Sequence, residues 1–195
     1  MILLVNIGSN PCPVFILFFD ILVYNKVMKL IKTIQFKNLK PEDIEKFEVR
    51  RAARAVVFDN ERNIGILYVG KYNYHKLPGG GLEGDESIDE ALKRECLEEI
   101  GCNTKTFGEL GEIIEYRDKW SLKQHSYCYM ANVVGEKEKP DFTQKEIDNG
   151  FKIKWMPLED AIKLLENDKP EGYEGGFIQI RDCNFLKEAA NYLKK

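Results

Sequence analysis

The spacing of hydrophobic residues from Met28 onward predicts a series of strands interrupted by helices. Apolar residues at every second position are typical of strands, and apolar residues three and four positions apart are typical of helices. This criterion predicts strands over residues 29–36, 53–58, 64–69, 107–116, 124–134 and 151–156. It predicts helices over residues 88–100, 157–166 and 182–193, the last with Phe185, Leu186, Ala189 and Leu193 facing inward.

Polar and glycine-rich stretches predict the connections between these elements. Residues 59–63 are polar and separate two strand-like runs, which is typical of a hairpin. Residues 39–47 indicate a connector or a short helix, and residues 173–176 indicate a loose glycine loop. Strands with a few interspersed helices favour the α/β class, with a mixed sheet between helical layers.

The first 27 residues differ from the rest of the chain. Residues 14–24 are strongly apolar, but Asp20 interrupts them and they are shorter than the roughly 20 residues of a membrane helix. No positive charge precedes this run and no small-residue cleavage site follows it, which disfavours a signal peptide. We expect residues 1–27 to be an apolar N-terminal extension and residues 28–195 to be a single domain. The role of the extension stays open between an upstream translated segment, a packing strand and a weak anchor.

Composition narrows the expected partners and compartment. A net charge of −3 over 195 residues offers no basic patch, which disfavours a nucleic-acid polymer as the partner. The five cysteines are scattered and form neither a disulfide framework nor a metal-binding pattern. We therefore expect a reduced, cytoplasmic protein without a membrane partner.

A glycine turn leads directly into an acidic helix between residues 77 and 102. Residues 79–81 are three consecutive glycines, which allow a tight turn with backbone groups open to a ligand. Ser87 followed by Glu90 is typical of a capping box at the start of a helix. Gly101 is typical of the residue that ends one. The helix is therefore predicted to have about three to four turns.

Three glutamates on this helix, Glu95, Glu98 and Glu99, lie three and four residues apart and project from one side. Like charges this close repel one another, so the arrangement calls for a compensating cation. A merely solvated acidic face would lie opposite the apolar face, but Glu95 and Glu99 continue the line of Ile88 and Leu92. Carboxylate oxygens suit a hard cation, which predicts Mg²⁺ first and Mn²⁺ second.

The pattern of residues across this stretch resembles a complete Nudix box, the signature of the Nudix hydrolases. The matching positions are Gly80, Glu86, Arg94, Glu95, Glu98, Glu99 and Gly101. Cys96 and Cys102 stand where the family usually has aliphatic residues, and both are small and apolar. The resemblance implies a Nudix-type α/β/α sandwich with a mixed sheet, on which the box helix packs.

The resemblance also implies an activity, which is the Mg²⁺-dependent hydrolysis of a nucleoside diphosphate linked to another group. The implied metal ligands are the carbonyl of Gly79 and the side chains of Glu95, Glu98 and Glu99. The implied structural residues are Gly80, Glu86, Arg94 and Gly101, with an ion pair between Glu86 and Arg94 that would hold the loop against the helix. Glu98 is the candidate for activating water, and Glu146 in a downstream loop is the alternative.

Residues outside the box supply candidates for substrate binding. They are Lys71 and Lys76 for a substrate phosphate, Tyr72 or Tyr74 for stacking on a base, and Trp120 or Tyr127 for a base or sugar. The plainer interpretation is that the lysines are exposed surface residues and that the aromatic residues belong to the core or the surface. These candidates therefore depend on whether the chain brings them to the metal site.

The leading hypothesis for the substrate is a nucleoside triphosphate such as 8-oxo-dGTP, cleaved to a monophosphate and pyrophosphate. This MutT-like interpretation is reached by elimination, because residues 116–119 lack the proline that ADP-ribose hydrolases often have beyond the box. ADP-ribose or another nucleotide sugar is the alternative. A non-catalytic, nucleotide-sensing Nudix module is a second alternative, although this box keeps all three glutamates. A homodimer involving the strand after Met28 is also left open.

Overall fold

The computed structural model describes residues 28–195, and the predicted extension over residues 1–27 lies outside the described residues. The strands are β1 (Leu30–Gln35), β2 (Glu48–Phe58), β3 (Asn63–Val69), β4 (Tyr74–Lys76), β5 (Asn103–Arg117), β6 (Leu122–Val134) and β7 (Phe151–Pro157). The helices are α1 (Pro41–Ile44), α2 (Ile88–Ile100), α3 (Gln144–Asp148), α4 (Leu158–Asn167) and α5 (Tyr173–Tyr192). Short 3-10 helices at Gly70–Tyr72 and Asp118–Trp120 precede β4 and β6.

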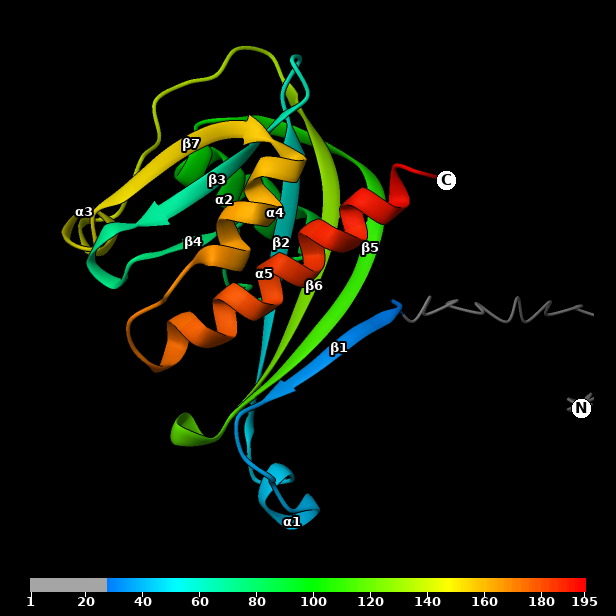
Figure 1. The fold of residues 1–195 in the computed structure, drawn as a ribbon, viewed down its shortest axis with the longest axis vertical. Helices are drawn as coiled ribbons and strands as arrows, with labels where there is room; N and C mark the ends of the chain where they lie inside the picture. Colours follow the sequence, from blue (N-terminus) through cyan, green and yellow to red (C-terminus); the bar gives the residue numbers. More distant parts are fainter. Residues whose placement is uncertain (1–27) are drawn as a thin grey trace, which may run out of the picture.

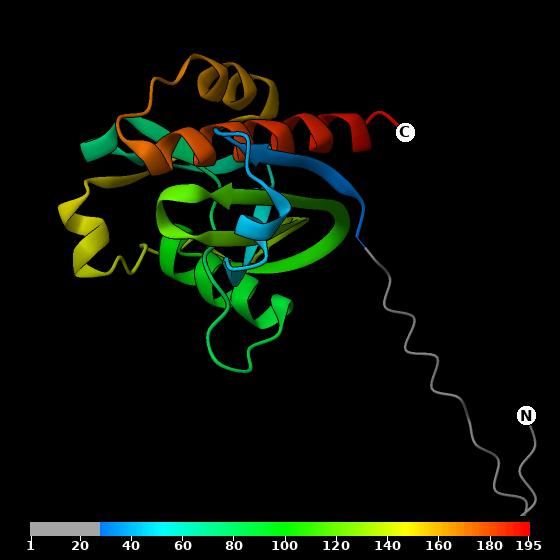
Figure 2. The ribbon, with the colours of Figure 1, turned by 90° about the horizontal axis from the view of Figure 1, so that it is seen from below.

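One mixed sheet of seven strands forms the middle of the described chain (Figure 1). Its strand order is β1-β5-β6-β2-β3-β4, and β7 also pairs with β3. β1 is parallel to β5 and β2 is parallel to β6, whereas the other pairs are antiparallel. Figure 2 shows α2 on one side of the sheet and α4 and α5 on the other. The predicted α/β/α sandwich with a mixed sheet is confirmed.

Two apolar cores lie on the two faces of this sheet. The core under α4 and α5 includes Val56, Ile66, Phe177, Phe185 and Leu186. The core under α2 includes Ala55, Leu67, Leu92, Cys96 and Ile100. Because successive residues of a strand point to opposite faces, Ala55 and Val56 of β2 enter different cores. This strand is therefore apolar over most of residues 53–58, and its one arginine there, Arg54, is buried as well.

Helix α2 begins and ends at the predicted residues. The Ser87 side chain accepts a hydrogen bond from the Glu90 N–H, and the Glu90 carboxylate accepts one from the Ser87 N–H. Gly101 ends the helix with a φ of 63°, and a Cβ there would lie 2.1 Å from the Glu138 carbonyl oxygen. The apolar residues Leu92, Cys96 and Ile100 form the side of the helix that faces the sheet. Among the described residues, no helix is long and apolar enough to cross a membrane.

The prediction of a loose glycine loop over residues 173–176 is wrong, because these residues form the first turn of α5. Two glycines disfavour a helix by intrinsic propensity. Close packing requires them here: a Cβ on Gly175 would lie 2.7 Å from Pro170 Cβ, and a Cβ on Gly176 would lie 3.2 Å from the Phe36 ring. Tertiary contacts therefore outweigh propensity at the start of α5.

Candidate active site

A cavity of about 650 Å³ opens beside the last turns of α2. Its walls are formed by the glycine turn, the acidic side of α2, the short helix α3 and the first turns of α5. The residues on these walls include Lys76, Gly79, Gly80, Glu95, Glu99, Glu146, Glu174 and Arg181. The fold thus brings segments that are far apart in the sequence to the predicted metal site.

The glycine turn runs along strand β2 and is hydrogen-bonded to it. The Ala53 N–H donates to the Gly80 carbonyl at 2.9 Å, and the Ala55 N–H donates to the Pro78 carbonyl at 3.1 Å. Gly79 has a φ of 131°, and a Cβ on it would lie 2.2 Å from the Ala53 carbonyl oxygen. Because only glycine fits this close to the strand, the backbone of the turn is fixed against the sheet.

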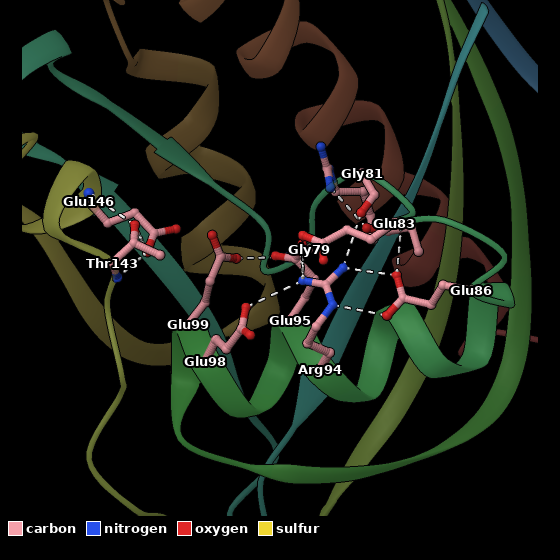
Figure 3. A network of polar contacts seen from close by, with 12 residues as sticks. Gly79, Gly81, Glu83, Glu86, Arg94, Glu95, Glu98, Glu99, Thr143 and Glu146 are labelled. Atoms are coloured by element: carbon pink, nitrogen blue, oxygen red, sulfur yellow. Dashed lines mark hydrogen bonds and ion pairs between the residues drawn. The ribbon is translucent and has the colours of Figure 1, made fainter.

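Arg94 connects the glycine turn to the acidic side of α2 (Figure 3). Its Nε and Nη2 donate to the two carboxylate oxygens of Glu86 at 2.9 and 3.0 Å, and Nη2 also donates to the Gly81 carbonyl at 3.1 Å. Its Nη1 donates to Glu95 at 2.9 Å and to Glu98 at 3.3 Å. The hydrogen bonds from Arg94 lower the pKa of Glu86. The predicted contact between Glu86 and Arg94 is therefore present, and the same guanidinium orients two of the three glutamates.

Glu99 is enclosed and is paired with Lys76. The Glu99 side chain is 3% exposed, its Oε1 lies 2.5 Å from Lys76 Nζ, and its Oε2 accepts from the Gly79 N–H at 2.8 Å. Lys76 Nζ also donates to the Gly79 carbonyl at 3.4 Å. Burial raises the pKa of Glu99, and the charge of Lys76 opposes this shift. Lys76, which we predicted as a contact for substrate phosphate, thus neutralises a carboxylate of the predicted metal site.

The donor atoms of this site suit a hard divalent cation. The proposed ligands, Gly79, Glu95, Glu98 and Glu99, offer only oxygen atoms, which Mg²⁺ prefers. Within residues 28–195, no three acidic, His or Cys side chains are already drawn together as a metal cage. Arg94 and Lys76 already form ion pairs with glutamates of the set. The site therefore has the oxygen donors that Mg²⁺ prefers, and a bound cation would add to the charge compensation that Arg94 and Lys76 supply.

Gly80→Ala is expected to disturb this site without unfolding the protein. A Cβ at position 80 would lie 1.9 Å from Glu95 Oε1, so the carboxylate must leave its hydrogen bond with Arg94. We expect kcat/KM to fall about 10- to 100-fold, as when an orienting contact of a metal ligand is lost. Gly84→Ala is the control for a loop substitution that leaves Glu95 untouched, since a Cβ there has no atom within 4 Å; its φ of 50° adds backbone strain, which thermal melting of both variants measures separately. Steady-state kinetics that show equal losses for both variants would contradict this assignment.

The two candidates for activating water lie on different helices. The Glu98 side chain on α2 is 42% exposed, and partial burial raises its pKa. Glu146 was predicted in a loop, but it lies in α3 and lines the cavity. Its carboxylate accepts hydrogen bonds from the N–H and the hydroxyl of Thr143, both at 2.8 Å (Figure 3). The spacing of Thr143 and Glu146 is itself a capping-box signal, so α3 was predictable from the sequence.

The structure brings some of the predicted substrate-binding residues to the cavity and leaves others outside it. Those that line the cavity are Lys76, Tyr72, Tyr74 and Trp120. Lys71 and Tyr127 are not among its lining residues. Lys71 Nζ lies 5.4 Å from the centre of the Tyr72 ring, and the Arg51 guanidinium lies 5.6 Å from the centre of the Tyr127 ring. Neither of these two residues lines the cavity, and their substrate contacts stay predictions.

Three arginines that were not among the predicted site residues line the cavity. Arg54 and Arg181 are 5% and 0% exposed and both line it, together with the exposed Arg50. Arg54 stands alone among apolar residues in the stretch 53–58, and this is a signal that the sequence does contain. Arg181 lies on α5, and no sequence pattern indicates that it meets β2.

Comparisons with known proteins agree with this geometry. The family profile described as NUDIX domain matches residues 48–175. Diphosphoinositol polyphosphate phosphohydrolase 3-alpha of Mus musculus is 32% identical over 142 residues, which cover 71% of this chain and 80% of that protein. Among solved structures, a NUDIX hydrolase from Nitrosomonas europaea has a TM-score of 0.57 at 15% identity and covers 74% of this chain and 90% of its own. The MutT protein of Methanosarcina mazei Go1 has a TM-score of 0.53 at 16% identity, and the match covers 77% of this chain and 99% of that chain. The glycine turn and acidic helix thus belong to a Nudix domain, and the protein is an enzyme of the Nudix hydrolase family.

Proposed function

We propose that the protein hydrolyses a phosphoanhydride bond of a small, multiply phosphorylated substrate in a Mg²⁺-dependent reaction. One observation carries the proposal: Glu95 and Glu99 line the same cavity as the buried Arg54 and Arg181. Carboxylates suited to a divalent cation thus adjoin guanidinium groups, which attract phosphate. This combination supports a reaction in which the charge of a phosphate chain is neutralised by both.

The residues of the chain have separate roles in this proposal. The metal ligands are Gly79 through its carbonyl, Glu95, Glu98 and Glu99. Bound Mg²⁺ would neutralise phosphate charge and lower the pKa of a water molecule. Arg94 orients Glu95 and Glu98 through its hydrogen bonds to both. Glu98 accepts the proton of the attacking water, and Glu146 on the cavity wall is the alternative base.

A nucleoside triphosphate is the first candidate substrate, with 8-oxo-dGTP as the specific case and a monophosphate and pyrophosphate as the products. Tyr72 and Trp120 line the cavity and are 37% and 49% exposed, so each offers a ring face to a base. ADP-ribose or a nucleotide sugar would use the same ring faces and is kept as the alternative. The retained glutamates Glu95, Glu98 and Glu99 disfavour a non-catalytic sensor.

A diphosphoinositol polyphosphate is the second candidate, because several cationic side chains line the cavity. They are Arg50, Arg54, Lys76, Lys145 and Arg181, of which Lys76 is paired with Glu99 and Arg181 with Asp182. A ring that carries many phosphates would use more of these cations than a single triphosphate. The mouse relative, at 32% identity, carries the name of this substrate class.

A substrate panel tests the proposed function. Purified protein with Mg²⁺ is given dNTPs, 8-oxo-dGTP, ADP-ribose, nucleotide sugars, dinucleoside polyphosphates and a diphosphoinositol polyphosphate, and the products are identified by mass. We expect strong preference for one class, with cleavage abolished by EDTA and restored by added Mg²⁺. Absence of cleavage across the panel would contradict the proposal and favour the sensor.

We further propose that residues 28–195 form one working domain in a reducing, cytoplasmic compartment. The family match over residues 48–175 lies within these bounds. The cysteines of the described chain, Cys96, Cys102, Cys128 and Cys183, are all free and buried, as expected for a reducing compartment. Size-exclusion chromatography with light scattering of this fragment tests the domain boundary and distinguishes a monomer from a homodimer.

A further inference from the structure

Arg54 is a buried cation that forms no ion pair within residues 28–195, although its charge is coupled to the charges of Asp182, Glu99 and Glu115. Its side chain points to the α5 side of β2, and the residue is 5% exposed. Its Nη1 donates to the Ala53 carbonyl at 2.9 Å, and its buried Nε has no hydrogen-bond partner. Within the part of the chain that the structure describes, no carboxylate forms an ion pair with it. A buried charge without an ion pair lowers the stability of the fold unless a ligand compensates that charge.

Arg181 lines the same cavity as Arg54 and is held in position by its neighbours. Its Nε and Nη2 donate to the Asp182 carboxylate at 2.7 and 3.0 Å. Its Nη1 lies 3.5 Å from Glu115 Oε2 but has no hydrogen-bond partner among residues 28–195. Arg181 is therefore oriented by Asp182 on one side, and on the side that faces Glu115 it keeps a donor without a hydrogen bond.

These arginines line the same cavity as Glu95 and Glu99 of the proposed metal site. Burial lowers the pKa of Arg54 to about 10, and the charge of Arg181 contributes to the same shift. The charges of Asp182, Glu99 and Glu95 oppose it. One cavity thus contains two neighbouring guanidinium groups and, within electrostatic range of them, the carboxylates proposed to bind Mg²⁺.

We propose that Arg54 and Arg181 form a subsite for an unesterified terminal phosphate group of the substrate. The proposal rests on the proposed function, because this phosphate belongs to the molecule whose anhydride bond is cleaved beside Glu95 and Glu99. A terminal phosphate carries a charge of about −1.5 to −2 and three acceptor oxygens, which match the unused guanidinium donors. ADP-ribose and dinucleoside polyphosphates are esterified at both ends and have no such group. The subsite therefore selects nucleoside triphosphates or polyphosphorylated rings over substrates whose phosphates are esterified at both ends.

Arg54→Met tests the subsite, because it removes the charge and leaves a side chain of similar length. Inorganic phosphate is titrated into the full-length, metal-free protein in EDTA and followed by calorimetry. We expect the Kd for phosphate to rise about 10- to 100-fold, as the loss of one or two charge-assisted hydrogen bonds predicts. Arg54→Lys should retain part of the affinity. Arg51→Met is the matched control, since Arg51 is exposed and its guanidinium lies over the Tyr127 ring.

Thermal melting separates a ligand-binding arginine from a structural one. In phosphate-free buffer, Arg54→Met should melt at the wild-type temperature or above it, because the variant removes an unpaired buried charge. Loss of phosphate affinity with an unchanged or higher Tm supports the subsite. Wild-type phosphate affinity in Arg54→Met, or a lower Tm, overturns it.

A kinetic comparison distinguishes failure of the subsite from failure of the proposed function. The preferred substrate of the panel is compared with its methyl ester at the terminal phosphate, in wild type and Arg54→Met. We expect wild type to prefer the unesterified form, and Arg54→Met to lose this preference through a higher KM. If Arg54→Met hydrolyses the substrate and still prefers the unesterified form over the methyl ester, the subsite alone is overturned. Phosphate binding that depends on Arg54, in a protein that hydrolyses nothing, overturns the proposed function alone.

Discussion

Glu98→Gln is expected to lower kcat for Mg²⁺-dependent hydrolysis by about 10²-fold or more, with little change in Tm. The Glu98 side chain is 42% exposed and its ion pair is with Arg94, so an amide of the same size barely alters the packing. The substitution removes one negative charge from the metal site and the proposed proton acceptor. Steady-state kinetics at saturating Mg²⁺ and thermal melting measure the two effects separately.

Variants on the same helix and across the cavity control this result. Asp89→Asn also removes a negative charge from α2. Because Asp89 pairs with Lys93 on the exposed surface, this substitution should leave the rate of hydrolysis unchanged. Glu146→Gln identifies the base: a large loss there, with a small loss in Glu98→Gln, would assign proton transfer to α3. Near-wild-type rates in both Glu98→Gln and Glu99→Gln would contradict the site itself.

Asp182→Asn is expected to have the largest effect on stability, a loss of about 3 kcal/mol. For a domain of this size, the corresponding fall in Tm is roughly 6 to 12 °C. Asp182 is fully buried, its Oδ2 accepts from the Leu77 N–H at 2.9 Å, and its carboxylate pairs with Arg181. Asparagine keeps the shape but removes the charge, which leaves Arg181 buried beside the more distant Glu115. Chemical denaturation measures the free energy of unfolding.

Asp160→Asn is the matched control for this prediction. Asp160 pairs with Lys163 on the exposed surface of α4, where ion pairs contribute little. Its replacement should change the free energy of unfolding by less than about 0.5 kcal/mol. If Asp182→Asn changes the free energy of unfolding as little as Asp160→Asn does, the Asp182 carboxylate does not hold Arg181 and Leu77 in place.

The part of the site that could be predicted is the part encoded by local spacing. Ser87, Glu90 and Gly101 specify where α2 begins and ends, because capping depends on residues within a few positions of each end. Glu95 and Glu99 follow from the same helical period, and both are largely buried as their place on the apolar side indicated. The Gly79 carbonyl was predicted as a metal ligand only from the resemblance to the Nudix box, because no helical pattern indicates it.

The parts that could not be predicted depend on contacts between distant segments. Arg181 approaches Arg54 only because α5 crosses the sheet over β2, and no periodicity of either segment indicates that crossing. The early start of α5 is a similar case, since Gly175 and Gly176 are helical through contacts with Pro170, Tyr74 and Phe36. The position of Tyr127 outside the cavity lining has a related reason: alternation along a strand indicates its two faces but not what lies against each face.

Hydrolysis in ¹⁸O-labelled water tests the central claim most directly. The preferred substrate of the panel is incubated with wild type and Glu99→Gln, with and without Mg²⁺, and the phosphate-containing products are analysed by mass. The account predicts that one product gains a single ¹⁸O on phosphorus, in wild type with Mg²⁺, and that Glu99→Gln or EDTA largely abolishes its formation. Unlabelled phosphate products, or labelled products formed equally well without Mg²⁺ or by Glu99→Gln, would contradict it.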